Sequence, residues 1–185
     1  MTQEEICRNY TARIFTSEYA DGNGVIVGNR LITAAHVLEN STSFELSFGD
    51  YFFRLPTKSA KFFQLPEPRE DGKFLDLAVF DLEDSFNSPI SFFDGDIDEA
   101  DFVCYAWRHT SDNNIESWKP FETDAMPFAE HGNFIECMMS EPLIPGFSGC
   151  PIFADGKLVG ILHGSGDEGR SCFFLKINVV NKYLS

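Results

Sequence analysis

The segment 144–166, IPGFSGCPIFADGKLVGILHGSG, decides how this chain is read. An Asp-Gly pair between two apolar runs is a strong signal for a tight β-hairpin. Before the hairpin, Gly146 and Gly149 flank Ser148 and allow a sharp backbone turn that leaves N–H groups exposed. We expect the amides of Gly146 and Ser148 to converge on one point, the arrangement that binds the oxyanion of an acyl-transfer reaction.

The rest of the chain is also predicted to be β-structure. Short apolar runs bounded by turn residues recur at 24–33 (GVIVGNRLIT), 75–82 (LDLAVFDL) and 171–177 (SCFFLKI), a pattern typical of barrels or sandwiches. The last residues, 178–185, place apolar side chains on one face of a short helix. The polar stretch 83–101 is the best candidate for a connector, which predicts two units, 1–88 and 89–185.

The overall charge and composition restrict the class of protein. The chain has 185 residues, of which 43% are hydrophobic and 20 are phenylalanine, so it has the composition of a globular protein with well-filled interiors. Its formal net charge is −15. Such an acidic surface repels phosphate backbones, so we expect no nucleic-acid partner.

The cysteines and the first residues predict the cellular setting. Five cysteines at wide spacings exclude a complete disulfide framework by parity and lack the paired spacing of a zinc site; they are Cys7, Cys104, Cys137, Cys150 and Cys172. Residues 1–20 do not have the pattern of a signal peptide, and no apolar run reaches membrane-spanning length. We therefore expect a cytoplasmic protein with no membrane attachment.

Three residues could act together on an amide bond. His36 follows an apolar run that ends in two alanines, Asp76 lies inside an apolar run, and Ser148 lies in the glycine turn. Each has an ordinary alternative: an exposed histidine, a strand-edge acid, a turn serine. Serine needs a base to become nucleophilic, histidine is that base near neutral pH, and a buried aspartate fixes its tautomer. Asp81 is a weaker candidate for the acid.

In this order the segments LITAAHV (31–37), DLAV (76–79) and PGFSGCPIF (145–153) resemble the signature segments of trypsin-like, chymotrypsin-fold serine proteases, and the likeness extends over 22–184. The resemblance implies an all-β chain of two six-stranded antiparallel β-barrels and a short C-terminal helix. It implies His36 as general base, Asp76 as its orienting acid and Ser148 as nucleophile. The Gly146 and Ser148 amides would form the oxyanion hole, and no metal or other cofactor would be needed.

Two positions depart from the secreted members of that family. Phe147 stands where secreted zymogens carry an acid, and Cys150 stands where a glycine is usual. The chain therefore resembles the intracellular bacterial or the viral 3C-like branch more closely. Cys150 is two positions beyond the nucleophile, and we interpret it as a packing residue.

The family's primary pocket maps onto residues on either side of Ser148. Pro142 would form its floor, Leu143 and Leu162 its walls, and Gly164 its open mouth. Without an acid at the floor, an apolar substrate side chain is favoured. His163 lies one residue away from the pocket histidine of related viral enzymes, and one residue's shift on a strand reverses the face. Its place in the pocket and a structural role both remain open.

The leading interpretation is a serine endopeptidase that performs limited proteolysis, with a regulatory or defence role in a bacterium as a hypothesis. A viral 3C-like protease that processes a polyprotein is the close alternative. A non-catalytic peptide-binding module with a protease fold is the third. The expected partner is a protein or peptide substrate, and the sequence leaves a regulatory partner open.

Overall fold

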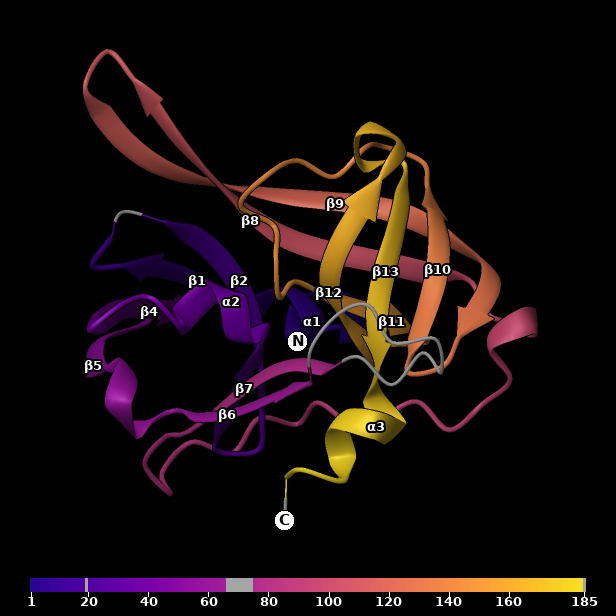
Figure 1. The fold of residues 1–185 in the computed structure, drawn as a ribbon, viewed down its shortest axis with the longest axis horizontal. Coiled ribbons are helices and arrows are strands. Elements are labelled where there is room, and N and C mark those ends of the chain that lie inside the picture. Colours follow the sequence, from indigo (N-terminus) through magenta and orange to yellow (C-terminus); the bar gives the residue numbers. More distant parts are fainter. Residues whose placement is uncertain (19, 66–74, 185) are drawn as a thin grey trace.

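The computed structural model describes residues 1–18, 20–65 and 75–184, whose strands form two antiparallel units (Figure 1). The first is a seven-stranded sheet with strand order β5-β4-β1-β2-β3-β7-β6. Its strands are β1 (Thr11–Thr16), β2 (Asp21–Val27), β3 (Arg30–Thr33), β4 (Ser43–Phe48), β5 (Tyr51–Pro56), β6 (Lys61–Leu65) and β7 (Leu75–Asp81).

The second unit is a closed barrel in the order β10-β13-β12-β11-β8-β9. Its strands are β8 (Phe102–Asp112), β9 (Ile115–His131), β10 (Phe134–Met139), β11 (Pro151–Ala154), β12 (Lys157–Gly166) and β13 (Ser171–Lys176). Short helices join and end the strands: α2 (Ala35–Leu38), η1 (Thr57–Ser59), η2 (Ile97–Glu99), η3 (Asp167–Gly169) and α3 (Ile177–Asn181).

This architecture confirms the predicted all-β fold class and the short C-terminal helix. The first sheet has seven strands among the described residues, one more than the six expected, because both β5 and β6 pair with its outer strands. The helix α3 packs against β12 and β13 at the lower end of the second barrel (Figure 1).

The burial patterns follow from the sequence. On β4 the alternate residues Phe44, Leu46 and Phe48 are buried, as expected for a strand with one face on the core. By contrast, all residues of β7 from Leu75 to Phe80 are buried, so this strand is covered on both faces. Asp76 is therefore a carboxylate in the middle of a buried strand, and it must find partners there.

The hairpin predicted from the Asp-Gly pair is present between β11 and β12. Asp155 and Gly156 both have positive φ angles, 48° and 72°, as a tight two-residue hairpin turn requires. The turn joins the two strands that follow Ser148, so it fixes how the chain leaves the glycine turn.

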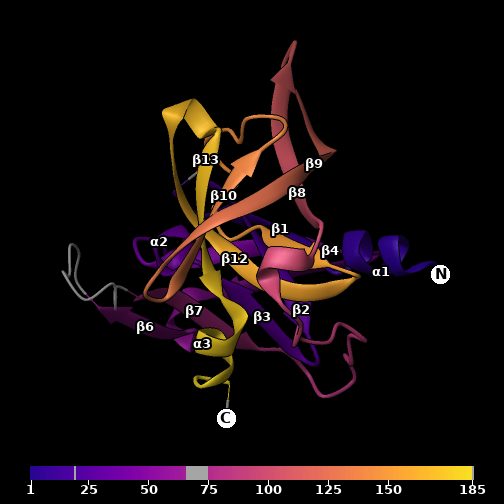
Figure 2. The same cartoon turned by 90° about the vertical axis from the view of Figure 1, so that its right-hand side faces the viewer.

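The hairpin of β8 and β9 extends well beyond the barrel and reaches over the first unit (Figures 1 and 2). Its tip is formed by Asn113 and Asn114, which adopt positive φ angles of 52° and 62°. Lower on the hairpin, His109 Nδ1 lies 3.0 Å from Asp21 Oδ1 on β2. The hairpin thus contributes to the contact between the two units.

The sequence analysis did not predict the helix α1 (Gln3–Asn9). It begins with a capping box, in which Thr2 and Glu5 each bond the other's backbone N–H. The Gln3 side chain and the Cys7 thiol both donate to the carbonyl of Gly156, so α1 lies against the second barrel. No helix among the described residues is long and apolar enough to cross a membrane.

The chain passes from the first unit to the second within a short segment. Ser88 bridges Gly28 at the end of β2, and Phe92 bridges Leu158 on β12. This path supports the division between residues 88 and 89, which remains our proposal.

Candidate active site

His36 lies at the edge between the two units. It belongs to α2, which begins directly after β3, and its neighbours Ala34 and Ala35 are fully buried. The imidazole has an exposed fraction of 39%, although the residues on both sides of it are buried. The two alanines leave no side-chain bulk around the turn, so the ring projects from the core.

Asp76 binds His36 through both carboxylate oxygens. Its Oδ1 accepts the backbone N–H of His36 at 3.0 Å, and its Oδ2 lies 2.5 Å from His36 Nδ1. The carboxylate has an exposed fraction of only 6%. The neutral ring therefore carries its proton on Nδ1, and Nε2 is the nitrogen that can accept a proton from a hydroxyl.

These contacts shift both pKa values in opposite directions. The hydrogen bond with Asp76 raises the pKa of His36 above its ordinary value, against the opposing effect of burial. Burial alone would raise the pKa of Asp76, but hydrogen bonds from His163 and His36 outweigh it and hold that pKa far below its usual range. Asp76 is thus ionised throughout the physiological range, and His36 is a stronger base than a free histidine.

The Ser148 turn is pressed against the first sheet. Gly146 and Gly149 have positive φ angles of 98° and 84°, which confirms that the turn needs glycine at both positions. A Cβ atom on Gly149 would lie 2.1 Å from the carbonyl oxygen of Asn23 and 2.3 Å from Thr33 Oγ1. Only glycine permits this approach, and Thr33 is the last residue of β3, just before α2.

The fully buried Asn23 of β2 ties the Ser148 turn to the rest of the molecule. Its backbone N–H donates to the carbonyl of Ser148 at 2.8 Å, and its side-chain amide donates to the carbonyl of Gly146 at 3.0 Å. The same amide group donates to the carbonyl of Trp107 at 3.1 Å, and Oδ1 accepts the Trp107 N–H at 2.6 Å. One residue therefore joins β2, β8 and the Ser148 turn.

The backbone amides of the turn divide into two groups. The N–H groups of Phe147, Gly149 and Cys150 donate to the carbonyls of Ile144, Leu162 and Phe147. In the described part of the chain, the N–H groups of Gly146 and Ser148 donate to no such carbonyl. These are the two amides that the sequence analysis assigned to an oxyanion hole.

In the described part of the chain, the connection between Ser148 and His36 runs through the residues around Thr33 and not through a hydrogen bond between the two side chains. Ser148 is half-buried, and among the residues that the structure describes its hydroxyl forms no hydrogen bond with His36. Contacts of this kind are often long in free enzymes and shorten when substrate binds. The common anchor is Thr33, whose hydroxyl donates to the carbonyl of Asn23 at 2.6 Å, three residues before His36.

A cavity of about 450 Å³ lies beside Ser148. Three of the predicted pocket residues, Leu143, Leu162 and Gly164, line it together with Ser148. Pro142 and His163 are not among its lining residues. The other residues that line it are Ile144, Pro145, Ser165, Gly166, Asp167, Glu168 and Gly169.

The ring of His163 is directed instead to the buried carboxylate. His163 Nδ1 lies 2.8 Å from Asp76 Oδ2, the same oxygen that His36 Nδ1 contacts. The His36 and His163 rings are nearly perpendicular, with centroids 5.8 Å apart. Asp76 therefore serves two histidines.

The donor atoms of His36, Asp76 and His163 all lie within 4.8 Å of one another, a spacing that could suit a cation. The separation of 2.8 Å between His163 Nδ1 and Asp76 Oδ2 is that of a hydrogen bond, and the 2.5 Å between His36 Nδ1 and the same oxygen is shorter still. Ligand atoms on a tetrahedral zinc ion, with Zn–N and Zn–O near 2.0 Å, would instead be about 3.3 Å apart. We describe the cluster as hydrogen-bonded, and the absence of a metal remains a prediction.

The remaining candidates have other partners. Asp81 binds Arg30 and Lys61 at 3.1 and 2.8 Å on the surface, so it is occupied away from His36. His131 Nε2 lies 2.6 Å from Glu136 Oε2. Neither residue contacts the Ser148 turn.

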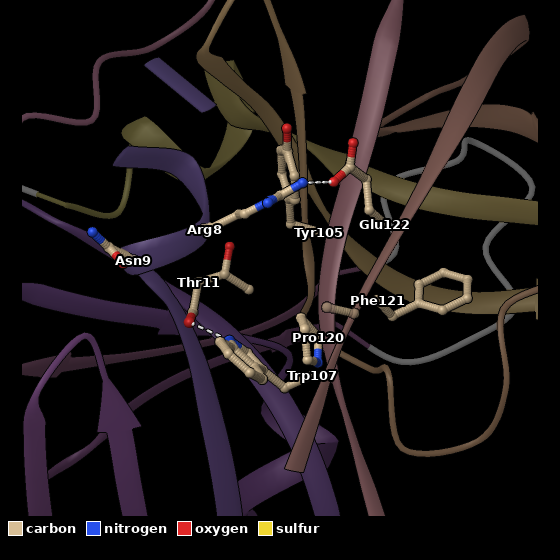
Figure 3. A pocket seen from close by; sticks show the side chains of 9 residues that line it. Arg8, Asn9, Thr11, Tyr105, Trp107, Pro120, Phe121 and Glu122 are labelled. Atoms are coloured by element: carbon tan, nitrogen blue, oxygen red, sulfur yellow. Dashed lines mark hydrogen bonds and ion pairs between the residues drawn. The ribbon is translucent and has the colours of Figure 1, made fainter. Parts of the chain in front are cut away.

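A second cavity, of about 360 Å³, lies between α1, β1, β8 and β9 (Figure 3). Arg8 and Glu122 form an ion pair at its rim, and Trp107 Nε1 donates to the carbonyl of Thr11 at 2.9 Å. Its charged groups are paired with one another, and none of the three predicted catalytic residues lines it.

Sequence reasoning missed Asn23. An asparagine within an apolar strand, flanked by Gly22 and Gly24, is the signal that was available. Burial of an amide demands hydrogen-bond partners, but its partners lie 84 and 123 residues away along the chain.

No protein-family model matches the chain, and no curated protein matches it. Solved structures do match. The Rv3671c protease of M. tuberculosis, in its inactive form, superposes with a TM-score of 0.69 at 17% identity over 98% of this chain and 90% of that one. The serine endoprotease of Yersinia pestis gives 0.70 at 17% identity over 98% and 65% of the two chains. A catalytically inactive tobacco etch virus protease in complex with substrate gives 0.63 at 15% identity over 95% and 81%.

The fold is therefore the two-barrel fold of chymotrypsin-like serine proteases. Bacterial and viral proteases both adopt it with similar scores. The expected resemblance is confirmed at the level of the fold.

We predict that Asn23→Asp destabilises the protein by about 3 kcal/mol or more, because the carboxylate can accept the Trp107 N–H but cannot donate to the Gly146 and Trp107 carbonyls. Urea unfolding measures the change. The matched control is the surface change Asn178→Asp, expected to shift the free energy of unfolding by less than about 0.5 kcal/mol. Equal effects of the two changes would contradict a central role for Asn23.

Proposed function

We propose that this protein is a serine endopeptidase that cleaves protein substrates at specific sites through an acyl-enzyme. One observation carries the proposal: His36, held by the buried Asp76, and the Ser148 turn, with its two uncommitted amides, are anchored to the same end of β3. General base, nucleophile turn and candidate oxyanion donors thus come from distant parts of the chain to one edge of the molecule.

The reaction would proceed in two halves. The Ser148 hydroxyl attacks the amide carbon while His36 Nε2 takes its proton, and the Gly146 and Ser148 amides hold the oxyanion. The imidazolium returns the proton to the leaving amine as the C–N bond breaks. Water, deprotonated by His36, then attacks the ester, and the imidazolium gives this proton to the Ser148 oxygen as the ester C–O bond breaks and the acid leaves. Asp76 keeps the Nδ1 proton in place and stabilises the imidazolium.

The substrate class and setting are proposed on similar grounds. The substrate complex of the tobacco etch virus protease supports a peptide or protein substrate for this fold. All five cysteines are free and buried, which suits a reducing cytoplasm. A bacterial regulatory protease and a viral polyprotein-processing protease both remain compatible with these similarities.

A non-catalytic peptide-binding module is the second candidate. The observation that favours it is the lack of a hydrogen bond from the Ser148 hydroxyl to His36 among the described residues. A protein in this state would bind peptides at the cavity beside Ser148 without activating the serine.

Reaction with a fluorophosphonate probe separates the two candidates. We expect the wild-type protein to be labelled and Ser148→Ala to be unlabelled, because the probe needs an activated hydroxyl. Peptide hydrolysis should fall by roughly 10⁴-fold or more in the variant. The control Ser140→Ala changes an exposed serine and should keep full labelling. Folded wild-type protein that resists the probe would favour the binding module.

The rate should depend on pH through His36. The Asp76 hydrogen bond raises the pKa of His36 above its ordinary value of 6.5. As the pH is lowered, kcat/KM should therefore begin to fall before pH 6.5 is reached. The free energy of unfolding should change in the opposite direction with pH. The charged His36 ring paired with Asp76 contributes stability that is full below pH 6.5 and is lost as the pH rises through the raised pKa of His36. Rate and circular dichroism measured over the same range distinguish titration from unfolding. A rate that is flat down to pH 5 would contradict this role of His36.

The cavity beside Ser148 supports a preference for an apolar substrate side chain before the cleaved bond. Its walls include Leu143 and Leu162, each with an exposed fraction of 4%, whereas the acidic Asp167 and Glu168 are exposed. A medium-sized apolar side chain would be buried against the leucines.

A randomised peptide library tests this preference. We expect cleavage after medium or large apolar residues in the wild-type protein. Gly164→Val should shift cleavage toward small residues, because a Cβ at position 164 meets open space and the added methyl groups narrow the cavity. Cleavage mainly after lysine or arginine would instead indicate that the carboxylates of Asp167 and Glu168 select the substrate side chain.

A further inference from the structure

His163 occupies an irregular position on β12. In the pairing of β12 with β13, Leu162 faces Phe174 and Gly164 faces Phe173, so His163 has no partner of its own in the register. Such a bulge bends a strand and changes the direction of the extra side chain. Leu162 and Gly164 line the cavity beside Ser148, while the ring between them turns to Asp76.

The two histidines bind the same oxygen atom. Asp76 Oδ2 lies 2.5 Å from His36 Nδ1 and 2.8 Å from His163 Nδ1. An ionised carboxylate has only acceptors, so each ring donates an Nδ1–H. The second donor therefore competes with the first for the charge on Oδ2.

Several described groups surround His163. Asp76 approaches from β7 and the His36 ring from α2, and Glu39, the residue after α2, acts electrostatically on His36. The ring of Phe134 on β10 packs beside it with centroids 5.5 Å apart. The side chain is largely covered, with an exposed fraction of 22%. Among the residues that the structure describes, Asp76 is an anion that His163 contacts directly.

We propose that His163 is a positioning residue that acts on His36 through Asp76: its Nδ1–H draws on the charge of Oδ2 and moderates how strongly that carboxylate favours a proton on His36. This rests on the proposed peptidase function. A carboxylate that served His36 alone would hold the imidazolium more firmly. His36 would then be protonated over more of the neutral range and would be unavailable as a base.

His163 thereby extends the pH range in which His36 is neutral, because the Nδ1–H that it donates to Asp76 Oδ2 weakens the hold of that oxygen on a proton at His36. This differs from a role in the substrate pocket.

NMR of the histidine side chains tests the proposal without a measurement of enzyme activity. In wild-type protein at a pH well above the titration of His36, we expect the ¹⁵N shifts of His36 and His163 to report protonated Nδ1 in each, with two strongly downfield N–H signals. A protonated Nε2 on His163 would overturn the proposal. Because this measurement uses the unmodified protein, it does not depend on a variant that folds.

Two substitutions then test the effect on His36. His163→Phe keeps a ring against Phe134 but removes the donor, and the His36 titration midpoint should rise by about 0.5–1 pH unit. His163→Asn retains a donor and should leave the midpoint nearer the wild-type value. His131→Ala, an exposed site paired with Glu136, should leave it unchanged. A midpoint that is unchanged or lowered in folded His163→Phe would overturn the proposal.

The pH dependence of kcat/KM separates the proposed role of His163 from the proposed peptidase function. In His163→Phe the acid limb of kcat/KM should move to higher pH with the NMR midpoint, whereas in the control His131→Ala it should keep the wild-type position. The NMR shifts can also be measured in Ser148→Ala. If the protein is never labelled or active, the peptidase proposal fails while the histidine shifts still report whether His163 acts through Asp76.

Discussion

The buried amide of Asn23 is the constraint on which the site depends. Two β units that share a short connector can slide or rotate unless polar groups at their interface fix the register. Asn23 provides this by bonding Gly146, Ser148 and Trp107 from within β2. Apolar contacts are non-directional and could not set the Ser148 turn to within a few tenths of an ångström. Hydrogen bonds in a dry interface can, because each unmet partner costs about 1–3 kcal/mol.

A second constraint comes from burying the charge of Asp76. A lone carboxylate in a strand that is covered on both faces would be strongly disfavoured. Three hydrogen bonds, from the His36 backbone and from the His36 and His163 rings, offset this desolvation. They also determine the chemistry, since the same bonds fix the tautomer of His36 and set its basicity. The interactions that stabilise the charge therefore cannot be separated from those that would support catalysis.

The sequence predicted the parts of this molecule that local pattern controls. Alternation and the Asp155-Gly156 turn predicted strands and hairpin, and residue types in order pointed to His36, Asp76 and Ser148. Features that depend on distant contacts were not predictable. The bulge that turns His163 toward Asp76 shifts a register by one residue, and the role of Asn23 depends on partners in the other unit. The helix α1 was not predicted because the surface on which it packs, at Gly156, is 153 residues away from Gln3 along the chain.

The buried thiols near Ser148 bear on the proposed choice of an oxygen nucleophile. Cys150 lies two residues after Ser148, fully buried, with its sulfur 3.5 Å from Cys104 Sγ. Burial raises the pKa of Cys150 well above its ordinary value, and burial raises the pKa of Cys172 to about 12. A thiol nucleophile must ionise, so these groups are inert packing atoms. Ser148 is less acidic still, but it is half-buried and lies in the turn whose amides are uncommitted, where a base and an oxyanion site can act on it together. In the proposed mechanism, a place in the turn with the uncommitted amides, rather than intrinsic acidity, decides which side chain attacks.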